Sequence, residues 1–284
     1  MVKSYVRYEQ TQCFGVISSQ SNVLWVAGGN SSSGRAIVGG LEEVLVWDLK
    51  TGELLQTLRD GLAPGAHNAS TSEAPASVTR LAYHEVNNIL AAGYHDGSIK
   101  IWDMASASVL ISFLGHKSAI SALKFDKSGT RLCSGSSDAS IILWDLISED
   151  GLFKLKGHKG LITGLSFLSM DWQAKDIDEI EDYLVTVLKD GLIKLWELKT
   201  KQCIETHVAH SSECWSLGVN PSQTLAITSG NRDQVKVWQI DLRKPDTEKI
   251  FEIGMFEKQS KAKCSDISFT TVQNTDLVYL QNSE

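Results

Sequence analysis

The sequence predicts an all-β fold made of repeated four-stranded units, and three features of its 284 residues support this prediction. A short apolar segment that ends in tryptophan and a polar or acidic residue occurs five times. Between these tryptophans lie short runs rich in Val, Ile and Leu, bounded by Gly, Ser, Asp or Lys. No segment shows a sustained helical period. Repeats of about 40 residues that each hold four short strands are typical of a β-propeller.

The recurring segment sets the length of the repeat. It reads VLVWDL, IKIWDM, IILWDL, IKLWEL and VKVWQI, with the anchors at Trp47, Trp102, Trp144, Trp196 and Trp238. The anchors are separated by 55, 42, 52 and 42 residues, so the basal period is 42 and two units carry insertions. The insertions fall at residues 60–77, which are rich in Gly, Pro, Ala and Ser, and at residues 170–182, which carry six carboxylates and one lysine. Both are predicted to be surface loops.

Every unit shows the same order of elements. In the third unit an apolar strand, ISALKF, is followed by RLCSGS, a tight turn, the tryptophan-bearing strand and an outer strand, GLFKLKG. The propeller therefore occupies residues 1–284. Its predicted blades cover about residues 1–59, 77–115, 116–157, 158–209 and 210–256, with part of a sixth at 257–284. The expected fold is an incomplete propeller of five blades and about half of a sixth.

Composition limits the classes of function. The formal net charge of −7 repels nucleic acid as a whole, so mainly protein partners are expected. The N-terminus has no apolar signal segment and no run of eighteen apolar residues occurs, which argues against secretion and membrane spanning. The five cysteines are scattered, so neither a metal knuckle nor a disulfide framework is predicted, and a reducing compartment fits best: Cys13, Cys133, Cys203, Cys214 and Cys264.

A second recurring pattern links polar residues to the anchor tryptophans. In the third unit His116 opens the blade, Ser134 lies ten residues before Trp144 and Asp138 lies six before it. The fourth unit repeats the pattern with His158, Thr186, Asp190 and Trp196. This pattern resembles the WD-repeat family, whose blades use a hydrogen-bonded tetrad of His, Ser/Thr, Asp and Trp. A buried indole N–H requires an acceptor, and a carboxylate that orients an imidazole holds a turn in place.

Other units depart from the tetrad pattern. The fifth has His210, Thr228 and Trp238 but Arg232 at the aspartate position. The second has Ala92 where Ser or Thr is expected, and the first has Leu41 at the aspartate position. These blades are expected to be held less tightly than the third and fourth.

A more specific resemblance covers nearly the whole chain. It rests on MVKSYVRYEQTQCFGVI, GHKSAISALKFDKSGTRLCSGSSDASIILWDL, KQCIETHVAHSSECWSL and FEIGMFEKQSK. These segments are similar to the N-terminal propeller of the Utp-twelve (Dip-two) family of nucleolar U-three small nucleolar RNA-associated proteins. The resemblance implies a scaffold subunit of the small-subunit processome, which processes the small ribosomal RNA precursor. It also implies a nucleolar location and other WD-repeat processome proteins as partners, with indirect or minor RNA contact.

The same resemblance implies a ring of seven blades. Only two strands, CSDISFTT and DLVYLQN, follow the fifth unit, so the sequence is expected to stop within its sixth blade. SYVRYEQ near the N-terminus is interpreted as a strand that would close the ring by pairing with the last blade.

A candidate binding face lies on the narrow side of the propeller that carries the tetrad histidines. Its residues would make a basic and aromatic patch for an acidic peptide or for RNA phosphates: His95, Lys117, Lys159, Lys189 and Trp215. Scattered solvated lysines and a core tryptophan remain the alternative. Lys258, Lys261 and Lys263 form a second basic stretch, and the acidic loop contains Trp172. A solvated loop is the default interpretation of the basic stretch. The acidic loop could dock a basic partner or serve only to keep the protein soluble.

No catalytic or metal-binding constellation is recognised. His207 and His210 are spaced as HxxH, but a strand places them on opposite faces and the tetrad already uses His210. No nucleophile elbow or phosphate-binding loop occurs, so no cofactor or small-molecule substrate is expected. One rival is a generic WD adaptor, such as a ubiquitin-ligase substrate receptor. These usually carry Arg two residues after the WD aspartate, where this chain has Lys50, Ala105 and Ile147. A propeller hydrolase is the other rival.

Overall fold

The computed structural model confirms the all-β prediction. It describes residues 18, 21–27, 34–60, 76–169, 182–231, 234–243, 248–258, 264–272 and 275–282. These residues form 22 strands and no helix. The predicted closing strand SYVRYEQ, Arg232, Trp172, Lys261, Lys263 and most of both insertions lie outside the described residues.

The strands form five antiparallel sheets of four and one of two. The first sheet holds β1 (Leu24–Val26), β2 (Arg35–Gly40), β3 (Glu43–Asp48) and β4 (Leu54–Leu58). The second holds β5 (Val78–His84), β6 (Ile89–Tyr94), β7 (Ile99–Asp103) and β8 (Ser108–Phe113). The third holds β9 (Ile120–Phe125), β10 (Arg131–Ser136), β11 (Ile141–Asp145) and β12 (Asp150–Leu155).

The fourth sheet holds β13 (Ile162–Ser169), β14 (Asp182–Leu188), β15 (Leu192–Glu197) and β16 (Gln202–Val208). The fifth holds β17 (Cys214–Val219), β18 (Leu225–Gly230), β19 (Gln234–Ile240) and β20 (Ile250–Glu257). The sixth is the hairpin of β21 (Cys264–Val272) and β22 (Thr275–Asn282). Each four-stranded sheet is a consecutive meander whose third strand carries the anchor tryptophan.

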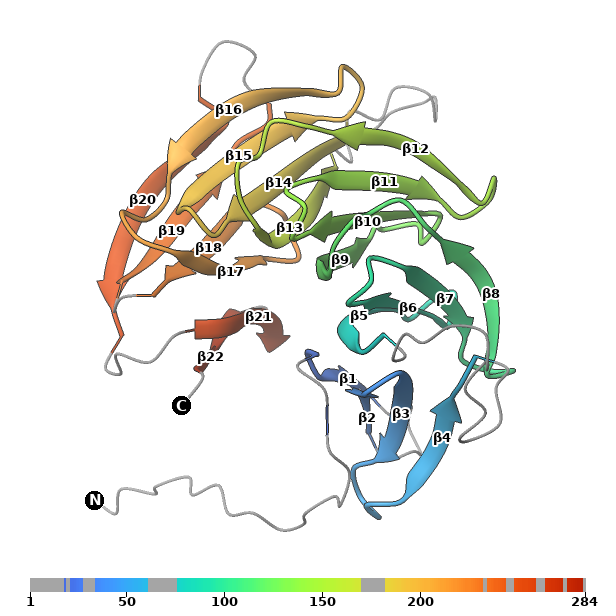
Figure 1. The fold of residues 1–284 in the computed structure, drawn as a ribbon. Helices are drawn as coiled ribbons and strands as arrows, with labels where there is room; N and C mark the ends of the chain where they lie inside the picture. The colour runs from blue at the N-terminus through green and yellow to red at the C-terminus, as the bar shows by residue number, and fades with distance from the viewer. Residues whose placement is uncertain are drawn as a thin grey trace, which may run out of the picture.

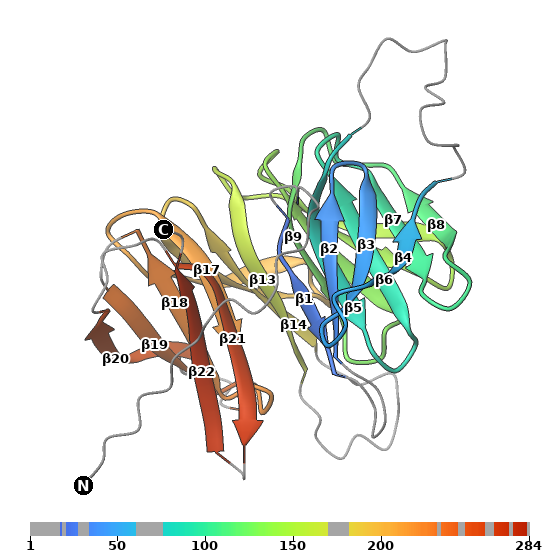
Figure 2. The ribbon, with the colours of Figure 1, turned by 90° about the horizontal axis from the view of Figure 1, so that it is seen from below.

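The sheets are arranged radially around one axis, with the first strand of each at the centre and the fourth at the rim (Figure 1). The first sheet and the β21–β22 hairpin form the two ends of the arc. Seen from below, β21 runs alongside β17 (Figure 2), and these two strands are in extensive contact. No described strand of the first sheet pairs with β21 or β22, so the described part of the chain forms an open propeller.

The hydrophobic core lies between neighbouring sheets. Ile99, Phe113 and Ile120 are buried in one cluster with Trp144, so the outer strand of the second blade meets the third blade there. The Trp144 indole stacks on Phe113, with ring centroids 4.6 Å apart. Trp102, Trp196 and Trp238 are buried in equivalent clusters, so these four anchor tryptophans stabilise interfaces between blades as well as their own sheets.

Side-chain hydroxyls bridge adjacent blades near the axis. Thr79 Oγ1 lies 3.1 Å from Gly93 O in its own blade and 2.7 Å from Ile120 O in the next. Ser121 repeats this one blade further on, 3.2 Å from Gly135 O and 2.6 Å from Ile162 O. These bonds connect inner strands that share no backbone ladder.

We expect Ser121→Ala to lower the free energy of unfolding by about 1 kcal/mol, because the cross-blade hydrogen bond to Ile162 O is lost. Chemical denaturation measures the change. Ser112→Ala, at an exposed serine on β8, is the matched control and should stay within about 0.5 kcal/mol of wild type. Equal stability of the two variants would show that the bridge contributes nothing.

Candidate functional site

The predicted polar residues gather at one end of the propeller, which we call the tetrad face. It consists of the loops that precede the inner strands and the turns between the second and third strands. Backbone hydrogen bonds join this turn to this loop in both the third and the fourth blade. Ser137 N donates to Ala119 O at 3.0 Å, and Lys189 N donates to Leu161 O at 2.9 Å. Each turn is thereby fixed beside the loop that leads into its own blade.

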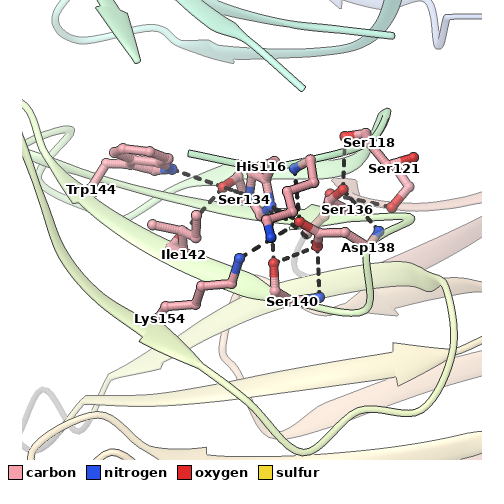
Figure 3. A network of polar contacts seen from close by, with 12 residues as sticks. His116, Ser118, Ser121, Ser134, Ser136, Asp138, Ser140, Ile142, Trp144 and Lys154 are labelled. Carbon is pink, nitrogen blue, oxygen red and sulfur yellow. Dashed lines mark hydrogen bonds and ion pairs between the residues drawn. The ribbon is translucent and has the colours of Figure 1, made fainter. Parts of the chain in front are cut away.

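The third blade forms a continuous hydrogen-bond chain (Figure 3). Trp144 Nε1 donates to Ser134 Oγ at 2.8 Å, and Ser134 Oγ lies 2.7 Å from His116 Nε2. His116 Nδ1 lies 3.4 Å from both carboxylate oxygens of Asp138 and 3.1 Å from Ser140 Oγ. All four predicted tetrad residues of this blade therefore belong to one network, which Ser140 extends.

The protonation states of His116 and Asp138 follow from their surroundings. Burial lowers the pKa of His116, and Asp138 opposes that shift. Burial disfavours the Asp138 carboxylate, but hydrogen bonds from the Ser140 hydroxyl and from the backbone N–H groups of Lys117 and Ser140 outweigh it. The pKa of Asp138 therefore lies well below its usual range. A neutral imidazole that donates from Nδ1 to an ionised carboxylate and accepts from Ser134 at Nε2 fits both shifts.

The fourth blade joins only three of its four predicted residues. Trp196 Nε1 donates to Thr186 Oγ1 at 3.0 Å, and Thr186 Oγ1 lies 3.5 Å from His158 Nε2. His158 Nδ1 is buried and has no hydrogen-bond partner among the described residues. Asp190 instead accepts from Leu192 N at 3.4 Å. Leu192 stands where the third blade has Ser140, so no hydroxyl links carboxylate to imidazole.

His158 is the most strongly perturbed histidine of the tetrad face. Burial lowers its pKa to about 3, and the positive charge of Lys194 adds to the effect. Its ring lies 4.9 Å from the Trp196 ring between centroids. His158 is therefore neutral at physiological pH and contributes mainly by packing.

In the fifth blade three residues form a shorter chain. Trp238 Nε1 donates to Thr228 Oγ1 at 2.9 Å, and Thr228 Oγ1 lies 3.1 Å from His210 Nε2. Burial lowers the pKa of His210. The Ser/Thr, His and Trp positions therefore come together in three successive blades.

The second blade lacks the central hydroxyl. Ala92 pairs with Lys100 across β6 and β7, as Ser134 pairs with Ile142 in the third blade. Trp102 Nε1 is buried without a hydrogen-bond partner among the described residues. The Tyr94 hydroxyl interacts with this indole outside hydrogen-bond geometry. The alanine thus leaves one buried donor unsatisfied.

We expect Ala92→Ser to raise the free energy of unfolding by about 1 kcal/mol, because its hydroxyl can accept from Trp102 Nε1 and donate to Lys100 O. Thermal unfolding should show a rise of roughly 2 to 4 °C. Ala91→Ser is the control, because Ala91 is buried in an apolar cluster where the hydroxyl has no indole partner. It should destabilise the protein. A fall in stability for both variants contradicts the expectation.

The structure joins two of the five residues proposed for the binding face. Lys189 Nζ lies 5.0 Å from the Trp215 ring centroid and 3.3 Å from Glu213 Oε1, while Trp215 Nε1 donates to Glu213 Oε2 at 3.1 Å. Trp215 is half-buried. Lys117, Lys159 and His95 are exposed in loops and turns of the same face, and no contact joins their side chains to this cluster. Lys117 and Lys159 therefore form points of positive charge that are separate from this cluster.

Two of these contacts had a sequence signal that was missed. Ser140 follows Asp138 by two residues, and Ser98 occupies the same place after Asp96, where its Oγ donates to the carboxylate at 2.7 Å. Glu213 stands two residues before Trp215. A hydroxyl or carboxylate two residues from a predicted site residue would have predicted these hydrogen bonds.

The described residues contain no group of three or more His, Cys, Asp and Glu side chains that could hold a metal ion. His207 Nε2 contacts Glu205 at 3.3 Å, whereas His210 belongs to the tetrad face. Within the part of the chain that the structure describes, no helix has the length and apolarity needed to cross a membrane.

Radial four-stranded blades with hydrogen-bonded His, Ser/Thr and Trp sets define a WD-repeat β-propeller protein. Residues 34–240 match the family model described as the WDR3 first β-propeller domain. The chain belongs to this family, and the resemblance found in the sequence is confirmed.

The chain is similar to proteins with related names. It is 47% identical over 292 residues to U3 small nucleolar RNA-associated protein 12 of Saccharomyces cerevisiae, covering 100% of this chain and 30% of that protein. It is 34% identical over 120 residues to the WD repeat-containing protein 3 homolog of Dictyostelium discoideum, covering 42% of this chain and 11% of that protein. The chain thus spans less than a third of either relative.

A solved structure supports the fold alone. The computationally designed Ika8 protein superposes with a TM-score of 0.60 at 24% sequence identity, covering 90% of this chain and 70% of that protein.

Proposed function

We propose that this chain is a non-catalytic scaffold domain of the small-subunit processome, acting in ribosomal RNA processing in the nucleolus. The observation that carries the proposal is the 47% identity, across the full chain, to a protein named for its association with U3 small nucleolar RNA. WD propellers present loops on a rigid frame, which suits assembly of several proteins.

The polar network supports a structural role for the tetrad residues. Three histidines that could be taken for general bases are buried and hydrogen-bonded to Ser or Thr within their own blades. Their lowered pKa values keep them neutral. Such groups hold loops in place for partners to contact.

Other WD-repeat processome proteins are the proposed partners, with RNA contact indirect or minor. The net charge of −7 disfavours a broad phosphate-binding surface. Lys117, Lys159 and Lys189 on the tetrad face are the proposed contact points for an acidic segment of a partner protein, together with Trp215, which Lys189 contacts.

The test is affinity capture of the full-length protein from cells at moderate salt, with and without ribonuclease. We expect WD-repeat processome proteins to remain after ribonuclease, together with small-subunit precursor RNA in the untreated sample. Recovery of cullin-ligase subunits, or of no stable partner, would instead favour the generic WD adaptor.

Two triple charge-reversal variants, one on the tetrad face and one at the opposite end of the blades, test whether partners bind the tetrad face. Lys117→Glu, Lys159→Glu and Lys189→Glu in one protein should reduce partner recovery. The control reverses three exposed lysines in turns at the opposite end of the blades: Lys50, Lys127 and Lys199. Equal recovery with both triple variants would exclude the tetrad face as the main contact while leaving the processome assignment intact.

A further inference from the structure

The central channel of the propeller contains a cavity of about 590 Å³. It is lined by the inner strands β5, β9, β13, β17 and β21 and by residues at the start of the first sheet. This volume lies within the range of small-molecule sites. The lining includes Trp215, so the cavity adjoins the cluster that Trp215 forms with Lys189 and Glu213 on the tetrad face. A small-molecule site here would be additional to the scaffold function.

Two cations stand out among small residues on the cavity wall. Arg80 follows the bulge of β5, and the residues in register with it on the next three inner strands are Ala122, Gly164 and Ser216. Lys124 lies on β9, two residues beyond Ala122. The small side chains leave the space around these two cations open.

Arg80 and Lys124 lack a full set of counter-charges. Arg80 Nε donates to Ser121 O at 2.7 Å, which fixes the guanidinium and leaves its other N–H groups available. Lys124 forms no hydrogen bond or ion pair within 4.0 Å with any described residue. Both interact with one carboxylate at longer range, that of Asp266 on β21.

The other carboxylate of the cavity wall, Asp126, already has partners of its own. Asp126 accepts from Arg131 Nε at 3.1 Å and from Ser128 Oγ at 2.7 Å. Two cations therefore face one available carboxylate in the channel, where the half-buried Arg80 and the exposed Lys124 are both accessible to a ligand. An anion in the channel would compensate the excess positive charge.

We propose that the central channel binds a compact phosphate-bearing anion, with Lys124 and Arg80 as its cationic ligands. A phosphate group accepts charge-assisted hydrogen bonds from both guanidinium and ammonium donors. Asp266 limits the affinity, because it competes for the same cations.

Titration calorimetry with pyrophosphate, at ionic strength held constant with sodium chloride, tests the site. We expect saturable one-to-one binding to the wild-type chain, weakened roughly tenfold or more in Lys124→Gln. Lys50→Gln, at an exposed lysine of the first blade, is the matched control and should bind as wild type. Thermal unfolding verifies that each variant is folded.

Asp266→Asn provides a second, opposite readout. Removal of its negative charge should tighten pyrophosphate binding several-fold, a gain that loss of folding cannot produce. Absence of saturable binding to wild type, or equal affinity in wild type, Lys124→Gln and Asp266→Asn, would overturn the proposal.

Discussion

Ser134→Ala is expected to lower the free energy of unfolding by about 3 kcal/mol, because one hydroxyl serves two buried partners. Ser134 Oγ accepts from Trp144 Nε1 at 2.8 Å and lies 2.7 Å from His116 Nε2. Its removal leaves a buried indole N–H and a buried imidazole nitrogen unsatisfied. The His116 imidazole would then be bound to Asp138 through Nδ1 alone, with Nε2 left without its serine partner.

Urea denaturation monitored by tryptophan fluorescence measures this loss, and the melting temperature should fall by roughly 6 to 12 °C. Ser166→Ala is the matched control, because the Ser166 hydroxyl makes only a 3.5 Å contact with a neighbouring carbonyl. It should change stability by less than about 0.5 kcal/mol. A loss below about 1 kcal/mol for Ser134→Ala would show that the indole and imidazole find other partners.

Ser134→Ala would place an alanine in the third blade at the position where the second blade already has Ala92. Ala92 leaves Trp102 Nε1 without a partner, and the blade is nevertheless formed. Hydrophobic burial between sheets therefore suffices to build a blade, while the hydroxyl adds stability to it.

The strand order was predictable because the anchor tryptophans fix a register. Each lies on the third strand of a sheet, and the 42-residue period places the other three strands around it. The fourth tetrad could not be judged in the same way. Asp190 has the expected position, but Leu192 in place of a serine leaves it unconnected to His158. The spacing of a motif does not report whether an intermediate donor is present.

Contacts between blades were harder to predict. Thr79 and Ser121 are 42 residues apart and bridge to Ile120 O and Ile162 O, yet each looks like an ordinary strand residue. Lys124 and Arg80 likewise gave no signal, because the two-residue period of a strand assigns faces of a sheet and not its distance from the propeller axis. These contacts depend on radial placement, which the structure supplies.

The wild-type protein is expected to lose stability as the pH falls below about 6.5, because its tetrad histidines are buried and neutral. His158 has a folded-state pKa of about 3. The unfolded chain takes up a proton at its ordinary pKa of about 6.5, so stability is complete above that pH and is lost down to about pH 3. At pH 5 this group alone should cost about 2 kcal/mol relative to pH 7.5. His116 and His210 shift in the same direction.

Asp138 does not account for a loss in this range. Its folded-state pKa is depressed, so its contribution is complete above the unfolded value of about 4 and disappears only at lower pH. Acid destabilisation between pH 6.5 and 4.5 therefore reports on the histidines.

His158→Phe isolates the largest of these effects. Phenylalanine keeps a ring beside Trp196 and removes the buried Nδ1 that has no partner, so stability at pH 7.5 should stay within about 1 kcal/mol of wild type. Thermal unfolding at pH 7.5 and pH 5 should show that the variant loses about 2 kcal/mol less than wild type. Ser112→Ala, at an exposed serine that does not titrate, should retain the wild-type pH dependence. If His158→Phe retains it too, His158 is solvated enough to be protonated in the folded blade.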